Sequence, residues 1–145
     1  MHRHVKILIL CVSAVIVLSG CAVEGSKHSE LRTSIAPVQP DMGRIYFYRL
    51  QEAVGSPFQP KVVLNGEEIG GSTPGGFFYV DRRPGNNKVY LSNEKEKIVE
   101  FTLDRGQTRY IRLSVALAVL TYRVYPELVA QDFAESEMRS LHYSK

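Results

Sequence analysis

Much of the chain alternates between apolar and polar positions over short stretches, which is the pattern of half-buried β-strands. Residues 44–50 (RIYFYRL) show it most clearly. Ile45 and Phe47 fall on one face of the expected strand, whereas Tyr46 and Tyr48 fall on the other. The first pair is therefore expected to face a core, and the tyrosines need a separate explanation.

Turn-forming residues separate these alternating stretches. Asn65-Gly66 is the strongest turn signal, because both residues tolerate the positive φ angles of a two-residue hairpin. Seven or eight strands at such spacing predict an antiparallel sandwich or barrel, and no strand–helix alternation appears. The stretches expected to form strands are 44–50, 61–64, 67–69, 76–81, 88–92, 97–103 and 108–115.

The apolar positions change to a helical period near the C-terminus. We expect one amphipathic helix there, packed on or beside the sheets. Glu135 and Arg139 form a favourable i,i+4 pair, and Pro126 sits near the expected start, where proline is tolerated. The apolar positions of this helix are Ala130, Phe133, Ala134, Met138 and Leu141.

Residues 113–120 are apolar except for Ser114. Eight residues are too few to span a membrane. Continuous apolarity predicts a buried strand and its connection. A hairpin that faces a partner is the alternative.

The first twenty residues are organised like a bacterial export signal. Met1 to Lys6 is basic, and residues 7–18 are apolar apart from Cys11 and Ser13. Twelve helical residues span about 18 Å, well short of the about 30 Å core of a bilayer. We therefore interpret this stretch as the helical core of a signal peptide.

The residues that follow carry the most specific motif in the chain. Leu18-Ser19-Gly20-Cys21 resembles the lipobox of bacterial lipoproteins, an aliphatic residue and two small residues before a cysteine. The resemblance implies that signal peptidase recognises Leu18, Ser19 and Gly20, and that Cys21 carries a diacylglyceryl group. An ordinary secretory signal or an uncleaved N-terminal helix is the alternative.

Lipid on Cys21 implies a location. One acyl chain gives only marginal membrane binding, whereas two or three hold a protein firmly. Ala22 stands where an aspartate favours retention in the inner membrane of many Gram-negative envelopes. We therefore expect a cell-envelope protein in the outer membrane, facing the periplasm, rather than in the inner membrane.

The domain organisation follows from these patterns. We expect a signal peptide over 1–20, the lipidated cysteine and a flexible tether over 21–42, and a folded domain over 43–145. Glycine, serine and proline recur in the tether without periodicity, and twenty flexible residues have an end-to-end distance of about 25 Å. His28 lies within it and is expected to be solvated.

Charge and cysteine content exclude some functions. The chain has 18 Lys and Arg against 15 Asp and Glu, and removing Arg3 and Lys6 leaves 16 against 15, a net charge of +1. A nearly neutral domain gives no electrostatic reason to bind nucleic acid. Both cysteines precede the expected domain, so its stability must come from apolar burial rather than from an internal disulfide.

Several short motifs of turn glycines and strand residues follow one another between residues 43 and 85. The motifs are residues 43–49 (GRIYFYR), 62–66 (VVLNG), Ile69-Gly70, 76–78 (GFF) and Pro84-Gly85. Over 43–115 they resemble a small bacterial lipoprotein family called domain of unknown function 2846. The resemblance implies a transthyretin-like or immunoglobulin-like β-sandwich, and it carries no catalytic site.

The same stretch also resembles the sandwich module called PEGA. That module often ends its proline-glycine hairpin with histidine. Asn86-Asn87 stand there in this chain, a departure from the PEGA pattern.

Side chains arranged for catalysis are not evident. His28 and His142 are the only histidines after the signal, and they form no zinc motif. Residues 70–76 have glycine spacing but lack the lysine and hydroxyl of a phosphate-binding loop. We expect no catalytic residue, no metal and no cofactor. An enzyme whose site is assembled from distant residues is the alternative.

Candidate binding residues are therefore surface features. Tyr46 and Tyr48 are expected to pack beneath the C-terminal helix, and an aromatic patch for a protein or glycan is the alternative. Two arginines beside a hairpin are either solvated or in contact with anionic lipid or peptidoglycan. The candidate surface consists of Tyr46, Tyr48, Phe77, Phe78, Arg82 and Arg83.

The leading hypothesis is a non-enzymatic lipoprotein, anchored in the membrane through lipid on Cys21. It would bind, or structurally support, another envelope component such as a protein or peptidoglycan. One alternative is a secretion-system-type outer-membrane lipoprotein, since one such component combines lipidation with a transthyretin-like sandwich. Another is a lipoprotein that binds a glycan or lipid.

Overall fold

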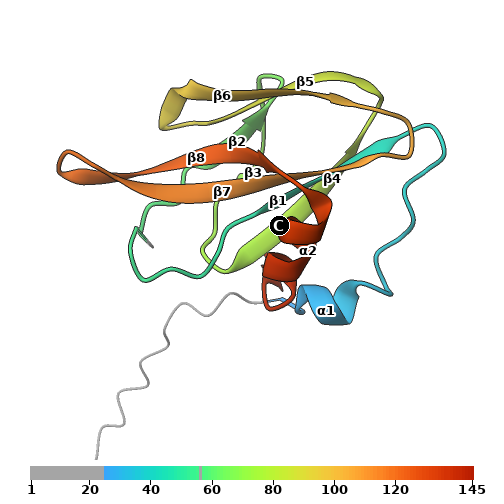
Figure 1. The fold of residues 1–145 in the computed structure, drawn as a ribbon, viewed down its shortest axis with the longest axis horizontal. Coiled ribbons are helices and arrows are strands. Elements are labelled where there is room, and N and C mark those ends of the chain that lie inside the picture. The colour runs from blue at the N-terminus through green and yellow to red at the C-terminus, as the bar shows by residue number, and fades with distance from the viewer. Residues whose placement is uncertain (1–24, 56) are drawn as a thin grey trace, which may run out of the picture.

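The structure is a computed structural model that describes residues 25–55 and 57–145. Over these residues the chain forms nine strands and two helices (Figure 1). The elements are α1 (His28–Leu31), β1 (Gly43–Tyr48), β2 (Lys61–Leu64), β3 (Glu67–Gly71), β4 (Gly76–Arg82), β5 (Gly85–Leu91), β6 (Glu94–Leu103), β7 (Thr108–Ala118), β8 (Thr121–Val129), α2 (Gln131–Met138) and β9 (His142–Tyr143).

The strands form two sheets that pack as a sandwich. One has the order β8-β7-β1-β4-β9 and the other the order β3-β2-β5-β6. The predicted mainly-β sandwich with a C-terminal helix is thereby confirmed.

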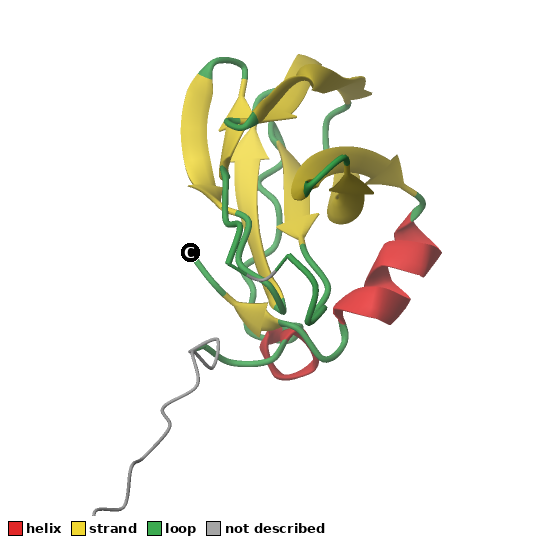
Figure 2. Ribbon diagram, turned by 90° about the vertical axis from the view of Figure 1, so that its left-hand side faces the viewer, coloured by secondary structure: helices red, strands yellow, loops and turns green. Residues whose placement is uncertain are grey.

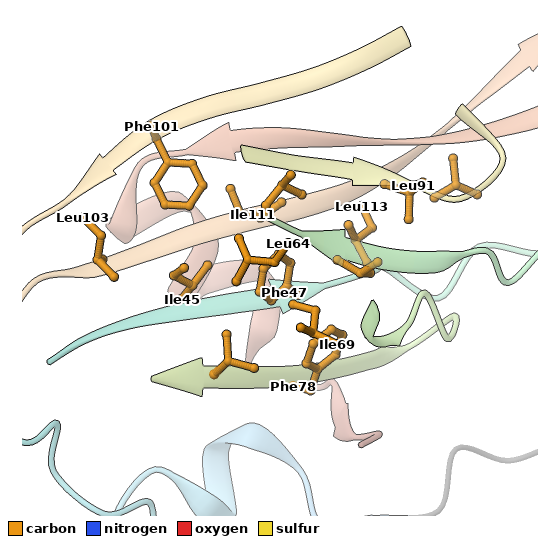
Figure 3. Packing of buried hydrophobic residues seen from close by; sticks show 14 residues of the cluster. Ile45, Phe47, Leu64, Ile69, Phe78, Leu91, Phe101, Leu103, Ile111 and Leu113 are labelled. Carbon is orange, nitrogen blue, oxygen red and sulfur yellow. The ribbon is translucent and has the colours of Figure 1, made fainter. Parts of the chain in front are cut away.

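The main core lies between the two sheets (Figure 3). Ile45 and Phe47 point into it from β1 and are fully buried, as their alternation predicted. Leu64 and Leu91 enter it from the opposite sheet. The rings of Phe47 and Phe78 stack with their centroids 5.1 Å apart. Strand alternation thus places one face of each strand in the same apolar layer.

One sheet is mixed, which the predicted antiparallel sandwich did not include. β1 pairs in parallel with β7, from Arg44 opposite Thr108 to Tyr48 opposite Arg112. β4 and β9 are also parallel. Parallel neighbours need a long crossover. The chain between β1 and β7 supplies it, because it forms the four strands of the other sheet as well as β4. Local periodicity carries no information on such pairing.

Both helices lie outside the sandwich, next to the five-stranded sheet (Figure 2). Tyr46 and Tyr48 point into a second apolar cluster there, together with Ala134 and Met138 of α2. Tyr48, Ala134 and Met138 are 0% exposed, and Tyr46 is 8% exposed. The expectation that these tyrosines pack beneath the C-terminal helix is confirmed.

The helix itself differs from the prediction in detail. Phe133 was expected on the buried face but is 48% exposed, because the buried stripe runs through Ala134 and Met138, one turn apart. Leu141 follows the helix and still packs in the second cluster. Pro126 lies within the edge strand β8, opposite Leu113, rather than at the helix start. An edge strand tolerates proline because one row of its amides needs no partner.

Part of the predicted tether is folded, so the prediction of a flexible segment over 21–42 is wrong from residue 25 to residue 35. Lys27 forms a β-bridge with His142, and α1 begins at the next residue. Leu31 and Ile35 pack against the second cluster. A four-residue helix is too short to produce a recognisable period.

The prediction that His28 is solvated is also wrong. Its side chain is 7% exposed, and its ring meets the edges of Phe77 and Tyr46 at centroid distances of 5.1 and 6.1 Å. Burial lowers the pKa of His28, nearby Arg32 lowers it further, and Glu135 opposes them. The imidazole serves as a packing group for the N-terminal segment.

The proposed signal peptide and its motif lie outside the described residues, including Leu18, Ser19, Gly20 and Cys21. Three residues, 22–24, separate Cys21 from Gly25. Among the helices that the structure describes, none combines the length and apolarity needed to cross a membrane.

Candidate interaction surface

The four aromatic residues of the predicted surface are buried, so that part of the prediction is wrong. Tyr46, Tyr48, Phe77 and Phe78 are between 0% and 8% exposed. The five-stranded sheet is covered on both faces, by the other sheet and by the helices, and these four aromatic side chains lie in the two apolar clusters so formed. An aromatic cleft for a glycan loses the residues on which it was based.

Polar groups under α2 serve to hold the helix. The Tyr48 hydroxyl donates to Glu137 Oε2 at 2.7 Å, and the Tyr110 hydroxyl donates to Glu135 Oε1 at 3.0 Å. Burial raises the pKa of both tyrosines, and the carboxylate acceptors raise it further. Arg112 lies 3.4 Å from Glu137. These contacts fix the helix to the sheet.

The two predicted arginines, Arg82 and Arg83, lie at the C-terminal end of β4. Gly43 pairs with Arg82, whereas Tyr48 pairs with Phe77. Arg82 Nη2 is 3.3 Å from Glu67 Oε2, and Arg83 is exposed. The structure therefore separates these arginines from the end of the sandwich where β1 ends.

The most exposed apolar side chains occur at the turn between β7 and β8. Leu117 is 75% exposed, Val119 91% and Leu120 102%. The predicted burial of 113–120 is wrong for these three residues, which lie at an exposed hairpin turn. β7 continues six residues beyond Arg112, which is level with the end of β1. The hairpin thus extends about 20 Å beyond the end of β1, and its turn stands apart from the other strands (Figure 1).

The turn itself uses residues that do not favour turns. Ala118 pairs with Thr121, which leaves Val119 and Leu120 as a two-residue connection. Leu120 has a φ of 120°, a region that costs a bulky residue about 1–3 kcal/mol. The β2–β3 turn of the same chain uses Asn65-Gly66 at φ 53° and 88°, which avoids this cost. Local turn chemistry therefore does not account for the apolar residues.

The β1–β2 loop extends this apolar surface. Val54 is 50% exposed and Phe58 44%. Gly55 between them has a φ of 74°, and a Cβ there would lie 2.8 Å from Val115 Cγ1. The loop therefore rests directly on the base of the hairpin. We call Val54, Phe58, Leu117, Val119 and Leu120 together the apolar end.

Arg49, which sequence patterns did not single out, holds this loop in place. Its side chain is 1% exposed. Nη1 donates to the Ser72 carbonyl at 2.8 Å and also to that of Phe58, and Nη2 donates to the Gly55 carbonyl at 2.8 Å. Burial lowers the Arg49 pKa, and Glu52 opposes this. An arginine after an apolar strand was the only available signal.

A groove with a volume of about 590 Å³ lies beside the first residues of β8, next to the hairpin turn. Phe58 and Tyr122 line it, together with the turn between β5 and β6. Across it Arg123 Nη1 lies 2.9 Å from Glu94 Oε2, and Glu94 is buried. The ion pair fixes the hairpin against the opposite sheet.

The described chain begins at the same end of the sandwich. The Gly25 carbonyl lies 2.8 Å from His142 Nδ1, and His142 pairs with Gly76 at the start of β4. β4 starts where β1 ends, because Phe77 pairs with Tyr48. The segment that leads from Cys21 therefore joins the domain at the end from which the hairpin projects.

In the part of the chain that the structure describes, no three His, Cys, Asp or Glu side chains come together in a way that could hold a metal ion. Arg49, Glu94 and Glu137 have structural partners. What distinguishes the surface is the apolar end.

Comparison with known proteins gives one match. The sequence model of a family described as "Protein of unknown function (DUF2846)" matches residues 39–123, more than half of the 145 residues. The match covers β7, the hairpin turn and the first three residues of β8, but not α2. No curated protein and no solved structure matches the chain.

Proposed function

The chain belongs to the DUF2846 family, and we propose that it is a non-enzymatic lipoprotein of the bacterial envelope that binds another envelope component through the apolar end. The observation that carries this proposal is the lipobox-like Leu18-Ser19-Gly20-Cys21, three residues before a folded domain. Its position after a short apolar stretch fits a processed lipoprotein better than a membrane-spanning helix.

The surface supports a binding role rather than catalysis. Glu135 and Glu137 accept hydrogen bonds from tyrosines that secure α2. Arg49 is occupied by loop carbonyls. The apolar end, by contrast, leaves aliphatic side chains in contact with water, and such exposed groups mark interaction sites when they gather in one place.

The proposed location is the outer membrane, with the domain in the periplasm. Ala22 supports it, because the residue after the cysteine is not the aspartate associated with the inner membrane. Envelope fractionation of the wild-type protein would reveal the location directly.

Labelling with a fatty-acid analogue tests the anchor. We expect Cys21→Ser to abolish labelling, to make precursor accumulate and to remove the mature protein from the envelope fraction. Cys11→Ser is the matched control, because that cysteine lies within the expected signal core; it should leave labelling unchanged. Equal labelling of the wild type and Cys21→Ser would refute the lipoprotein assignment.

A further inference from the structure

We infer that the component bound by the apolar end is the bilayer that holds Cys21, into which the tip of the β7–β8 hairpin inserts. This inference rests on the proposed lipid anchor. It adds a second, side-chain contact between the domain and the membrane. The domain would then be held in one orientation rather than hanging from a single point.

The segment between Cys21 and Gly25 is short compared with the hairpin. From Cys21 to Gly25 the chain takes four residue steps, which span at most about 14 Å when extended. The hairpin projects about 20 Å beyond the strand end where that segment joins the domain. A domain whose strands run toward the membrane therefore brings the tip to the bilayer before the anchor segment is fully stretched.

The tip of the hairpin is uncharged and apolar. Residues 116–121 (ALAVLT) carry no charge, and Leu117, Val119 and Leu120 are almost fully exposed. Tyr122 pairs with Leu117 next to the turn, and Phe58 lies on the β1–β2 loop and lines the same groove as Tyr122. Aliphatic side chains at the tip with aromatic rings beside them suit the boundary between acyl chains and headgroups.

The backbone of the hairpin also suits a shallow position in lipid. β7 and β8 pair continuously from Tyr110 opposite Val129 to Ala118 opposite Thr121. The ladder satisfies the backbone groups that face the partner strand. Those on the two outer edges, where β8 has no neighbour and β1 has ended, need water, so the tip would lie at the depth of the hydrated headgroups.

A second protein is a poorer occupant of this surface. A stable protein interface takes about 20–30 residues from each partner. The tip offers three large side chains on a narrow projection. A narrow projection of this size can insert between lipids, but it buries too little surface to hold a protein partner.

Site-specific fluorescence tests the inference in the mature, lipidated protein. Val119→Cys would carry an environment-sensitive dye, and the protein would be reconstituted in vesicles of phosphatidylethanolamine and phosphatidylglycerol. Because Cys21 is acylated, the new cysteine is the only free thiol. We expect a blue shift on reconstitution and severalfold quenching by lipids that carry a spin label near the headgroup.

Arg83→Cys is the matched control, since Arg83 is exposed at the other end of β4. Its dye should remain in water and show no quenching. The protein could float with the vesicles while the dye at residue 119 stays exposed to water and is not quenched. That result would overturn the inference and leave the lipoprotein assignment intact. A dye shielded from water but not quenched by lipid would mean a protein occupant, and would also overturn it. Absence of acylation would overturn both proposals.

The turn offers a second variant that does not depend on the dye position. Val119→Asn with Leu120→Gly copies the β2–β3 turn and relieves the φ of Leu120. Followed by a dye at Leu117→Cys, this variant should fold at least as stably yet weaken the docking equilibrium at least about tenfold, because two apolar side chains are lost. Unchanged quenching in this variant, with its fold verified by circular dichroism, would contradict membrane insertion.

Discussion

Arg49, the residue after β1, holds two separate loops in place. Its guanidinium joins β1 to the carbonyls of Gly55 and Phe58 in one loop and to that of Ser72 in another. Because those loops are distant from one another in sequence, no spacing rule reveals the contact. The family-like motif GRIYFYR marks the residue but not its partners.

Replacement of this residue should be costly. Arg49→Met keeps an apolar stem but leaves three carbonyls without their donor, so we expect the free energy of unfolding to fall by about 3 kcal/mol. Urea denaturation followed by circular dichroism measures the change. Ser72→Ala is the control: the Ser72 hydroxyl is buried and has no hydrogen-bond partner among the described residues, so its loss should be close to neutral. A near-neutral Arg49→Met would remove the role assigned to the guanidinium.

At the scale of elements, alternation predicts strands well and contacts poorly. Ile45 and Phe47 face the core as expected, because a period of two allows only one assignment of faces. Leu117, Val119 and Leu120 were misassigned, since continuous apolarity describes a buried strand and an exposed hairpin equally well. The docking of α1 escaped prediction because its support comes from Phe77 and Tyr46, which are remote in sequence.

Docking of α1 should depend on pH through His28. Because burial keeps its folded pKa below the ordinary 6.5, the unfolded chain binds a proton that the folded chain does not. This contribution to stability is complete above pH 6.5 and is lost as pH falls from 6.5 through the folded pKa. Urea midpoints at about pH 7.5 and about pH 5.5 should therefore differ, with the lower stability in acid.

His28→Phe is the control for this pH dependence. It preserves a ring against Phe77 but cannot titrate, so the difference between the two pH values should shrink. Arg32 and Glu135 also act on the imidazole, and both remain in the variant. An equal pH dependence in the variant and the wild type would place its origin in other groups.

The two ends of the whole molecule differ in chemistry. The anchor segment and the apolar end share one end, whereas Arg82 and Arg83 occupy the other. The proposed short link from Cys21 to Gly25 makes this layout matter, since it keeps the first end within about 14 Å of the lipid.

Lengthening that link should weaken hairpin insertion without affecting the fold. Insertion of about 20 Gly and Ser residues between Glu24 and Gly25 lowers the effective concentration of the tip at the membrane. We expect less quenching of a dye at Val119→Cys and an unchanged urea midpoint. The same insertion between Arg83 and Pro84 should leave quenching as in the wild type, because it lies at the far end. Equal quenching with both insertions would show that tip insertion does not depend on the short link.

The bridge between Lys27 and His142 also has a consequence for biosynthesis. It joins the beginning of the described chain to its last strand, so it forms only after nearly all of the polypeptide has been delivered. Until then the segment next to Cys21 has no partner on which to close. The enzymes that would acylate and cleave the precursor thus act before Lys27 has paired with His142, which happens only once the C-terminus has arrived.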